Sequence, residues 1–166
     1  MNQKNLHNAQ VIDKLKALAE SIDFAMLCTQ LSAQPFHAVP MSTKRVDNEG
    51  NLWFLSGKDS NHNCHIAGEE AVELIYSDPD SMQFLNVYGS ATIHTEPAIL
   101  KELYESSDDA WFSGADDPNL TAIRVAPLAA HYWDTKGSTM IALLKLGVAA
   151  MTGDEVDVSE HGDLTV

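Results

Sequence analysis

The sequence has few basic residues and few cysteines. Ten Lys and Arg stand against 24 Asp and Glu, which gives a formal net charge of −14 at pH 7. Such a surface repels phosphate backbones and anionic lipid headgroups, so we expect no nucleic acid and no membrane among its partners. The two cysteines, Cys28 and Cys64, are too few for a disulfide scaffold or a four-cysteine zinc site. We interpret both as free thiols in a reducing compartment.

Long apolar runs are also absent. The longest, residues 140–151, is interrupted by Lys145 and is shorter than the roughly 20 residues that span a bilayer. The first residues lack the basic-then-apolar order of a signal peptide. We therefore expect a cytoplasmic protein.

The motifs of several enzyme classes are missing. The sequence has no Gly-x-Ser-x-Gly elbow, no Gly-x-Gly-x-x-Gly fingerprint and no Walker phosphate loop. This disfavours a serine hydrolase, a Rossmann dehydrogenase and a P-loop enzyme. No side chain is identifiable as a catalytic acid or base, so the catalytic residues stay unknown.

One polar cluster contains residue types that bind metals. Two imidazoles, a thiol and a carboxylate lie within residues 59–65, Asp59-Ser60-Asn61-His62-Asn63-Cys64-His65. No second group of ligands follows at a recognisable spacing. We therefore expect a polar loop and a capped helix start here, and no metal site.

Size and patterning indicate one domain that is mainly β. The 166 residues, 45% of them hydrophobic, suffice for one core. Helical spacing is found in residues 8–22 and 97–104, with a short capped helix expected within 56–70 and another helix at 140–151. Strand patterns occupy residues 24–29, 37–46, 52–55, 71–76, 82–95, 121–125 and 129–133. Because strands outnumber helices and hairpin turns join them, we expect a small antiparallel barrel with peripheral helices.

Two further features refine this prediction. Gly89, in the middle of the long strand 82–95, indicates a bulge or a close backbone approach. Residues 153–166 carry five acidic residues and no Lys or Arg. We expect a domain over residues 1–152 and a disordered acidic tail over 153–166.

Several short motifs follow one another in an informative order. They are His37-Ala38-Val39-Pro40-Met41, Leu52-Trp53-Phe54-Leu55-Ser56, Ser60-Asn61-His62, Asp117-Pro118-Asn119, Ile123-Arg124-Val125 and Tyr132-Trp133-Asp134. Together they resemble the general stress protein branch of the pyridoxamine phosphate oxidase-like split barrels. The resemblance runs from about Val11 to Gly153.

This resemblance implies a six-stranded antiparallel split β-barrel that forms a homodimer. It also implies a flavin, usually FMN, with FAD as the alternative, in clefts at the subunit interface. The backbone around Pro40, Met41, Trp53 and Phe54 would line the ring, and Trp133 would flank it. The residues that the resemblance places near the cofactor are His37, Val39, Pro40, Met41, Trp53, Phe54, Leu55, Ser56, Lys58, Ser60, Asn61, His62 and Trp133.

Two departures concern the cofactor's phosphate. The family commonly has Arg at the position of Val39 and Lys at the position of His62, so both usual phosphate cations are missing. Charge-assisted hydrogen bonds of this kind contribute about 1.5–3 kcal/mol each, so flavin binding is expected to be weak or absent. Lys58, or Arg124 across a dimer interface, is the available substitute. Arg45 lies about 20 Å along the strand from Val39, too far to replace it in the same subunit.

Three functions remain open from the sequence. The first is a flavin-dependent oxidoreductase. The second is a non-catalytic binding module for flavin or for haem, with His37 and His62 as candidate axial ligands. The third is a dimeric scaffold that has lost its cofactor.

Overall fold

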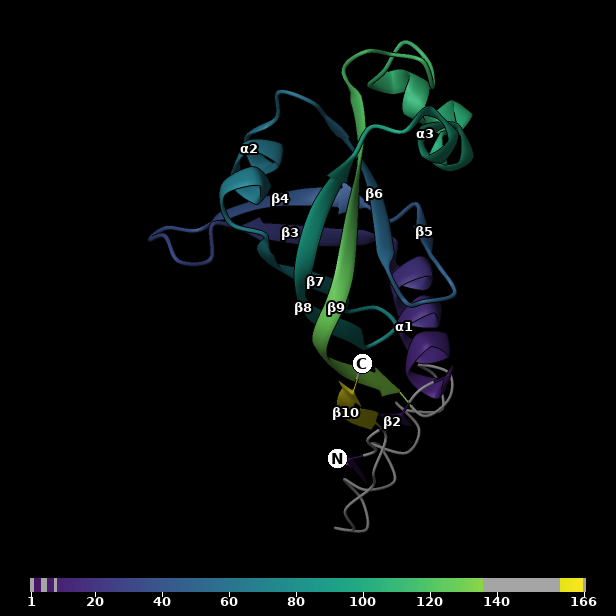
Figure 1. Cartoon of the computed structure of the whole chain (residues 1–166). Coiled ribbons are helices and arrows are strands. Elements are labelled where there is room, and N and C mark those ends of the chain that lie inside the picture. The colour runs from purple at the N-terminus through teal and green to yellow at the C-terminus, as the bar shows by residue number, and fades with distance from the viewer. Residues whose placement is uncertain (1, 4–5, 8, 136–158, 166) are drawn as a thin grey trace.

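The computed structural model describes residues 2–3, 6–7, 9–135 and 159–165 (Figure 1). The helices are α1 (Ala9–Ile22), α2 (Asn61–Gly68), α3 (Pro97–Leu103) and the 3-10 helix η1 (Ser106–Ala110). The strands are β1 (Asn2–Gln3), β2 (Leu6–His7), β3 (Phe24–Thr29), β4 (His37–Ser42), β5 (Arg45–Val46), β6 (Leu52–Gly57), β7 (Ala71–Asp78), β8 (Gln83–His94), β9 (Leu120–Thr135) and β10 (Ser159–Thr165). The helix expected at residues 140–151 lies outside the described residues.

The strands form one curved sheet. Its order is β1-β10-β9-β8-β7-β3-β4, with β6 paired to β9 and β5 paired to β6. All pairings are antiparallel except those of β1 and β2 with β10. The sheet curls so strongly that β3 and β4 cross β8 and β9 steeply (Figure 1). This half-barrel confirms the mainly antiparallel split-barrel fold predicted from the sequence.

Alternate strand residues point into the concave side of the sheet and form the core. Leu27, Phe54, Leu74, Tyr76 and Tyr132 are completely buried there. Helix α1 adds its apolar stripe, as its helical spacing predicts. A second, smaller cluster lies where α3 contacts β6 and β9, and contains Trp53, Leu100, Leu103, Leu120 and Ala122.

Strand boundaries differ from the prediction in two places. The predicted strand 37–46 is divided into β4 and β5, because Thr43 bonds to the carbonyl oxygen of Asp23 while Lys44 bonds to that of Trp53. The predicted segments 121–125 and 129–133 are one strand, β9. Pro127, which has no N–H to donate, lies opposite Gly89 at a register shift, where a missing ladder bond is tolerated.

The structure also tests the predictions made for Gly89 and for the C-terminal segment. A Cβ atom on Gly89 would lie 2.6 Å from the carbonyl oxygen of Ala126, and the register shifts between Tyr88 and Gly89. Both parts of the Gly89 prediction are therefore confirmed. Within the predicted acidic tail, residues 159–165 form β10 on the edge of β9, so this part is ordered by backbone pairing although Leu164 is its one large apolar residue.

Candidate functional site

A cleft of about 470 Å³ opens beside β4, β6, the start of α2 and the segment that follows η1. Its walls are mostly apolar. The lining residues are Phe24, Val39, Pro40, Met41, Ser42, Lys44, Leu55, Ser56, Gly57, His62, Asp108, Trp111 and Phe112. Such a cleft, apolar with a few polar groups, is suited to a planar organic ligand.

Six residues expected near the cofactor line this cleft, namely Val39, Pro40, Met41, Leu55, Ser56 and His62. They come from three separate motifs of the sequence. Strand β4 contributes consecutive residues, because none of its residues is fully buried and both of its faces are accessible. The fold therefore brings the centre of the predicted site together.

Other residues expected near the cofactor do not line the cleft in this chain. Phe54 points into the core and is fully buried. Trp53 packs in the second cluster and donates from Nε1 to Asp47 at 2.9 Å. Strand alternation places Phe54 on the opposite face of β6 from Leu55, whereas Trp53 shares the face of Leu55 and packs in the second cluster.

The remaining predicted residues lie around or beyond the cleft. Ser60 is the N-cap of α2, and its Oγ accepts from the N–H of Asn63, which confirms the capped helix start expected within residues 59–65. Asn61 is exposed at the start of the same helix, and Lys58 lines a different hollow. Trp133 lies on β9 against His131, with 4.4 Å between ring centroids. Neither His37 nor Trp133 reaches the cleft wall, so a flavin contact from Trp133 would require a second copy of the chain.

Ser56 holds helix α2 against the sheet. Its hydroxyl donates to Oδ1 of Asn63 at 2.8 Å and lies 2.8 Å from Oγ1 of Thr121. The amide nitrogen of Asn63 donates to the same Thr121 oxygen at 2.9 Å. All three side chains are buried. This network occupies the Ser56 hydroxyl and fixes the helix turn that carries His62.

His62 is the imidazole that lines the cleft. Its Nε2 is buried and has no hydrogen-bond partner within the described part of the chain. Burial lowers the pKa of His62, and the nearby His37 and His65 lower it further. The ring of His65 lies 5.1 Å from that of His37, and its Nδ1 is 3.0 Å from the hydroxyl of Thr29. The imidazole at the cleft is therefore neutral at pH 7.

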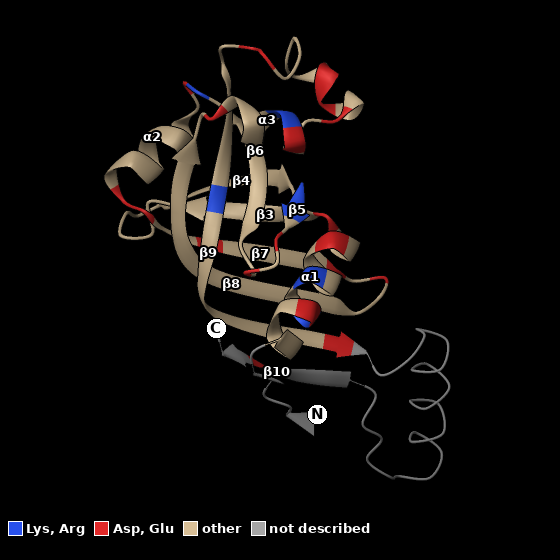
Figure 2. Ribbon diagram, turned by 45° about the vertical axis from the view of Figure 1, so that its right-hand side comes forward, with Lys and Arg blue, Asp and Glu red and all other residues tan. Residues whose placement is uncertain are grey.

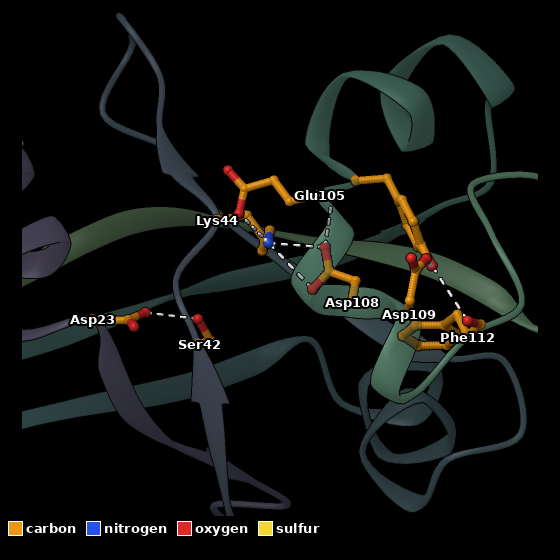
Figure 3. A network of polar contacts seen from close by, with 8 residues as sticks. Asp23, Ser42, Lys44, Glu105, Asp108, Asp109 and Phe112 are labelled. Atoms are coloured by element: carbon orange, nitrogen blue, oxygen red, sulfur yellow. Dashed lines mark hydrogen bonds and ion pairs between the residues drawn. The ribbon is translucent and has the colours of Figure 1, made fainter.

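The opposite wall of the cleft is fixed by Lys44 (Figure 3). Its ammonium group lies 2.9 Å from Glu105 and 2.9 Å from Asp108, and only 7% of its side chain is exposed. Burial lowers the pKa of Lys44, but its hydrogen bonds to Asp108 and Glu105 outweigh burial and raise it. These ion pairs connect the segment between β4 and β5 to η1. They thereby place the two residues that follow η1 in the chain at the cleft.

Those two residues, Trp111 and Phe112, were not predicted as site residues. Trp111 is 82% exposed, which is unusual for so large an apolar side chain. The carbonyl oxygen of Phe112 accepts from the hydroxyl of Tyr104 at 3.3 Å. An aromatic pair in an acidic loop was the available signal, but nothing in its spacing connects it to β4. Lys44 was missed for the same reason.

Other kinds of site find little support in the residues that are described. Among them, no group of three or more His, Cys, Asp and Glu is placed to hold a metal ion. Cys28 and Cys64 are both free thiols, Cys28 buried and Cys64 exposed. None of the helices in the described ranges is both long and apolar enough to cross a membrane.

Known proteins resemble the chain over most of its length. The family model for proteins like pyridoxamine 5′-phosphate oxidase matches residues 10–157. Protein bli-3 of Neurospora crassa is 20% identical over 167 residues, covering 94% of this chain and 80% of that protein.

Solved structures share the fold. A Jannaschia sp. CCS1 protein provisionally called general stress protein 26 superposes with a TM-score of 0.80 at 22% identity, over 95% of this chain and 99% of that one. A general stress FMN/FAD binding protein of Xanthomonas citri gives a TM-score of 0.66 at 25% identity, over 79% and 93% of the two chains.

Proposed function

The chain belongs to the pyridoxamine 5′-phosphate oxidase-like family, and from that premise we propose that it binds a flavin, FMN in the first place, in the cleft between β4, β6 and α2. The observation that carries the proposal is the convergence of Val39, Pro40, Met41, Leu55 and His62 on one cleft. The FMN/FAD binding described for the Xanthomonas citri protein supports it.

The cleft fits the two halves of FMN. Val39, Met41 and Leu55 offer apolar surface for the isoalloxazine ring. The unpartnered Nε2 of His62 and the first turn of α2 lie where a phosphate can accept hydrogen bonds, because helix N-termini favour anions. FAD shares the ring and the first phosphate, so the same groups would hold it.

When bound, the flavin would supply hydride or electron transfer, and the protein would supply position and exclusion of water. Met41 and Phe112, which line the cleft, would shield the ring from water. The Ser56 network holds α2, and the ion pairs of Lys44 hold the segment with Trp111 and Phe112. Lys44 and Asp108 neutralise each other, which leaves His62 as the titratable side chain of the described cleft wall that has no ion pair.

The cleft offers fewer suitable contacts to the phosphate of FMN than to its ring. Lys44 is the lysine that lines the cleft, and its ammonium group already forms ion pairs with two carboxylates. His62 is neutral in the absence of a ligand because its pKa is lowered by burial and by two imidazoles. We therefore propose that FMN binds weakly and exchanges with solvent, which distinguishes this chain from relatives with Arg and Lys at positions 39 and 62.

We also propose that the chain forms a homodimer through the outer face of β3, β4 and β7. Phe24, Met26 and Ile75 are 60%, 39% and 39% exposed, and Pro40 lies opposite Met26 on the same face. This apolar face adjoins the cleft, and β4 leaves an edge unpaired. Sedimentation at micromolar concentration should give twice the chain mass, and the double variant Met26→Lys with Ile75→Lys should sediment as a monomer. A monomeric wild type would contradict this interface.

The function is tested by spectroscopy and then by turnover. The purified protein is incubated with excess FMN, freed of unbound cofactor, and its absorbance spectrum is recorded. Retained flavin bands support the proposal, whereas a Soret band would identify a haem protein. Oxidation of NADH or NADPH with an electron acceptor then tests oxidoreductase activity, because a flavin that binds without being reduced would identify a carrier.

A further inference from the structure

The two arginines of the chain, Arg45 and Arg124, line a second pocket of about 670 Å³. We call it the arginine pocket and define it by Lys16, Arg45, Trp53, His94 and Arg124. It shares no lining residue with the flavin cleft. Figure 2 shows the basic segments on β5 and β9 within a chain whose other coloured segments are mostly acidic.

Strand register places the arginines on both sides of Trp53. Arg45 is the register partner of Trp53, and Trp53 is the register partner of Arg124. Paired residues project to the same face, and neighbouring strands are about 4.8 Å apart. The guanidinium of Arg45 lies 6.0 Å from the Trp53 ring, and the ring of His94 lies 5.2 Å from it. The sheet therefore presents two guanidinium groups around one indole.

These guanidinium groups are incompletely paired. Arg45 forms an ion pair with Glu102 of α3. Arg124 is half-buried, yet its side chain makes no hydrogen bond or ion pair with any residue in the described ranges. The Nε atoms of both arginines are buried without a hydrogen-bond partner there. A buried guanidinium without a partner is unfavourable, so an external anion that pairs with Arg124 would be bound.

The carboxylates of the pocket do not supply that anion. Asp47 accepts from Nε1 of Trp53 and from Asn51, which together lower its pKa although burial raises it. Glu49 accepts from Asn51 at 3.4 Å, and Glu96 pairs with His94 at 3.4 Å. Each carboxylate therefore has donors of its own, and Arg124 is left facing the pocket.

We propose that the arginine pocket binds the phosphate group of a small phosphorylated molecule. A carboxylate has two oxygens and satisfies one guanidinium fork, whereas the three terminal oxygens of a phosphate can accept from two forks and from Lys16 together. The pocket is also large enough to hold the organic part of a phosphate ester. This site is independent of the proposed flavin site, and its test needs no flavin.

The test uses the fact that the chain has two arginines. An NMR spectrum of the Arg Nε–H groups should show two signals, which Arg45→Lys and Arg124→Lys assign. Inorganic phosphate and glycerol 3-phosphate are titrated separately, with sodium chloride and acetate as matched controls. We expect both signals to shift saturably with the phosphates and not with the controls. Tighter binding of glycerol 3-phosphate would identify an organic phosphate, and equal affinities would identify free phosphate.

Variants extend the test. Arg124→Lys should weaken binding of glycerol 3-phosphate about 10- to 100-fold, because it removes a forked donor. Lys101→Met, which removes an equally positive but exposed side chain, should leave the affinity unchanged. The proposal is overturned if the wild-type signals do not shift, or if they shift equally with chloride. It is also overturned if FMN alone saturates the shift, because the pocket would then belong to the flavin.

Discussion

Replacing His62 by lysine tests how the cleft holds the phosphate of FMN. His62 lines the cleft, and its buried Nε2 has no partner among the described residues, so it has one donor position available. Its pKa is lowered by burial and then by His37 and His65, so it carries no charge at pH 7.5. A lysine is charged there and can form one charge-assisted hydrogen bond, worth about 1.5–3 kcal/mol. We therefore expect His62→Lys to bind FMN about 10- to 150-fold more tightly.

The assay is quenching of flavin fluorescence at pH 7.5. Riboflavin, which lacks the phosphate, is the control ligand, and its affinity should not change. The double variant Val39→Arg with His62→Lys should add a second bond of the same size. In the wild type, FMN affinity should rise as the pH falls below about 6.5, because His62 protonates at a pH below its usual value and bound phosphate favours the charged form. Equal gains for FMN and riboflavin, or no gain, would refute this account of the phosphate site.

Three further predictions concern stability. Because the pKa of His62 is lowered in the folded protein, the unfolded chain binds more protons as the pH falls below about 6.5, and the free energy of unfolding decreases there. In urea unfolding at pH 5 and pH 7, His62→Gln should reduce this decrease. An unchanged pH dependence would contradict the role given to His62. Gly89→Ala should lower the free energy of unfolding by about 1–3 kcal/mol because its Cβ would meet backbone atoms, whereas Gly68→Ala meets nothing within 4 Å; equal effects would contradict the close approach. Lys44→Met should cost about 2 kcal/mol and weaken FMN binding, because it leaves Asp108 unpaired. The control Lys101→Met, which breaks an exposed ion pair, should lower the free energy of unfolding by less than about 0.5 kcal/mol. If Lys44→Met lowers it by no more than this control, η1 is held by other contacts.

The sequence was most informative where one short-range rule dominates. The apolar stripe of α1, the capped start of α2 and the bulge at Gly89 are local features, and the structure has them as predicted. Strand ends were harder to predict. Pro127 indicates an interruption, but β9 continues through it because the bulge at Gly89 removes the need for its N–H.

In the candidate site, too, local motifs were predicted and contacts between distant residues were not. Residues within the recognised motifs, such as Val39, Met41 and Leu55, do meet at one cleft. Lys44 and Trp111 were not predicted, because the ion pairs that bring η1 to β4 connect residues 61 or more positions apart. The backbone of Trp53 is expected to line the flavin ring, whereas its side chain packs in the second cluster and lines the arginine pocket. Trp53 shares one face of β6 with Leu55, and sequence spacing alone does not show which residues of that face reach the cleft.

The most direct test of the central claim, that the cleft holds a flavin, is the absorbance of the protein after incubation with FMN and removal of free cofactor. Three proteins should be compared: the wild type, Val39→Trp, which fills the cleft, and Ala17→Trp, which adds the same ring on the exposed face of α1. The account predicts flavin bands for the wild type and for Ala17→Trp, and none for Val39→Trp. Equal retention by all three proteins would place the flavin elsewhere, and a colourless wild type would contradict flavin binding by this chain.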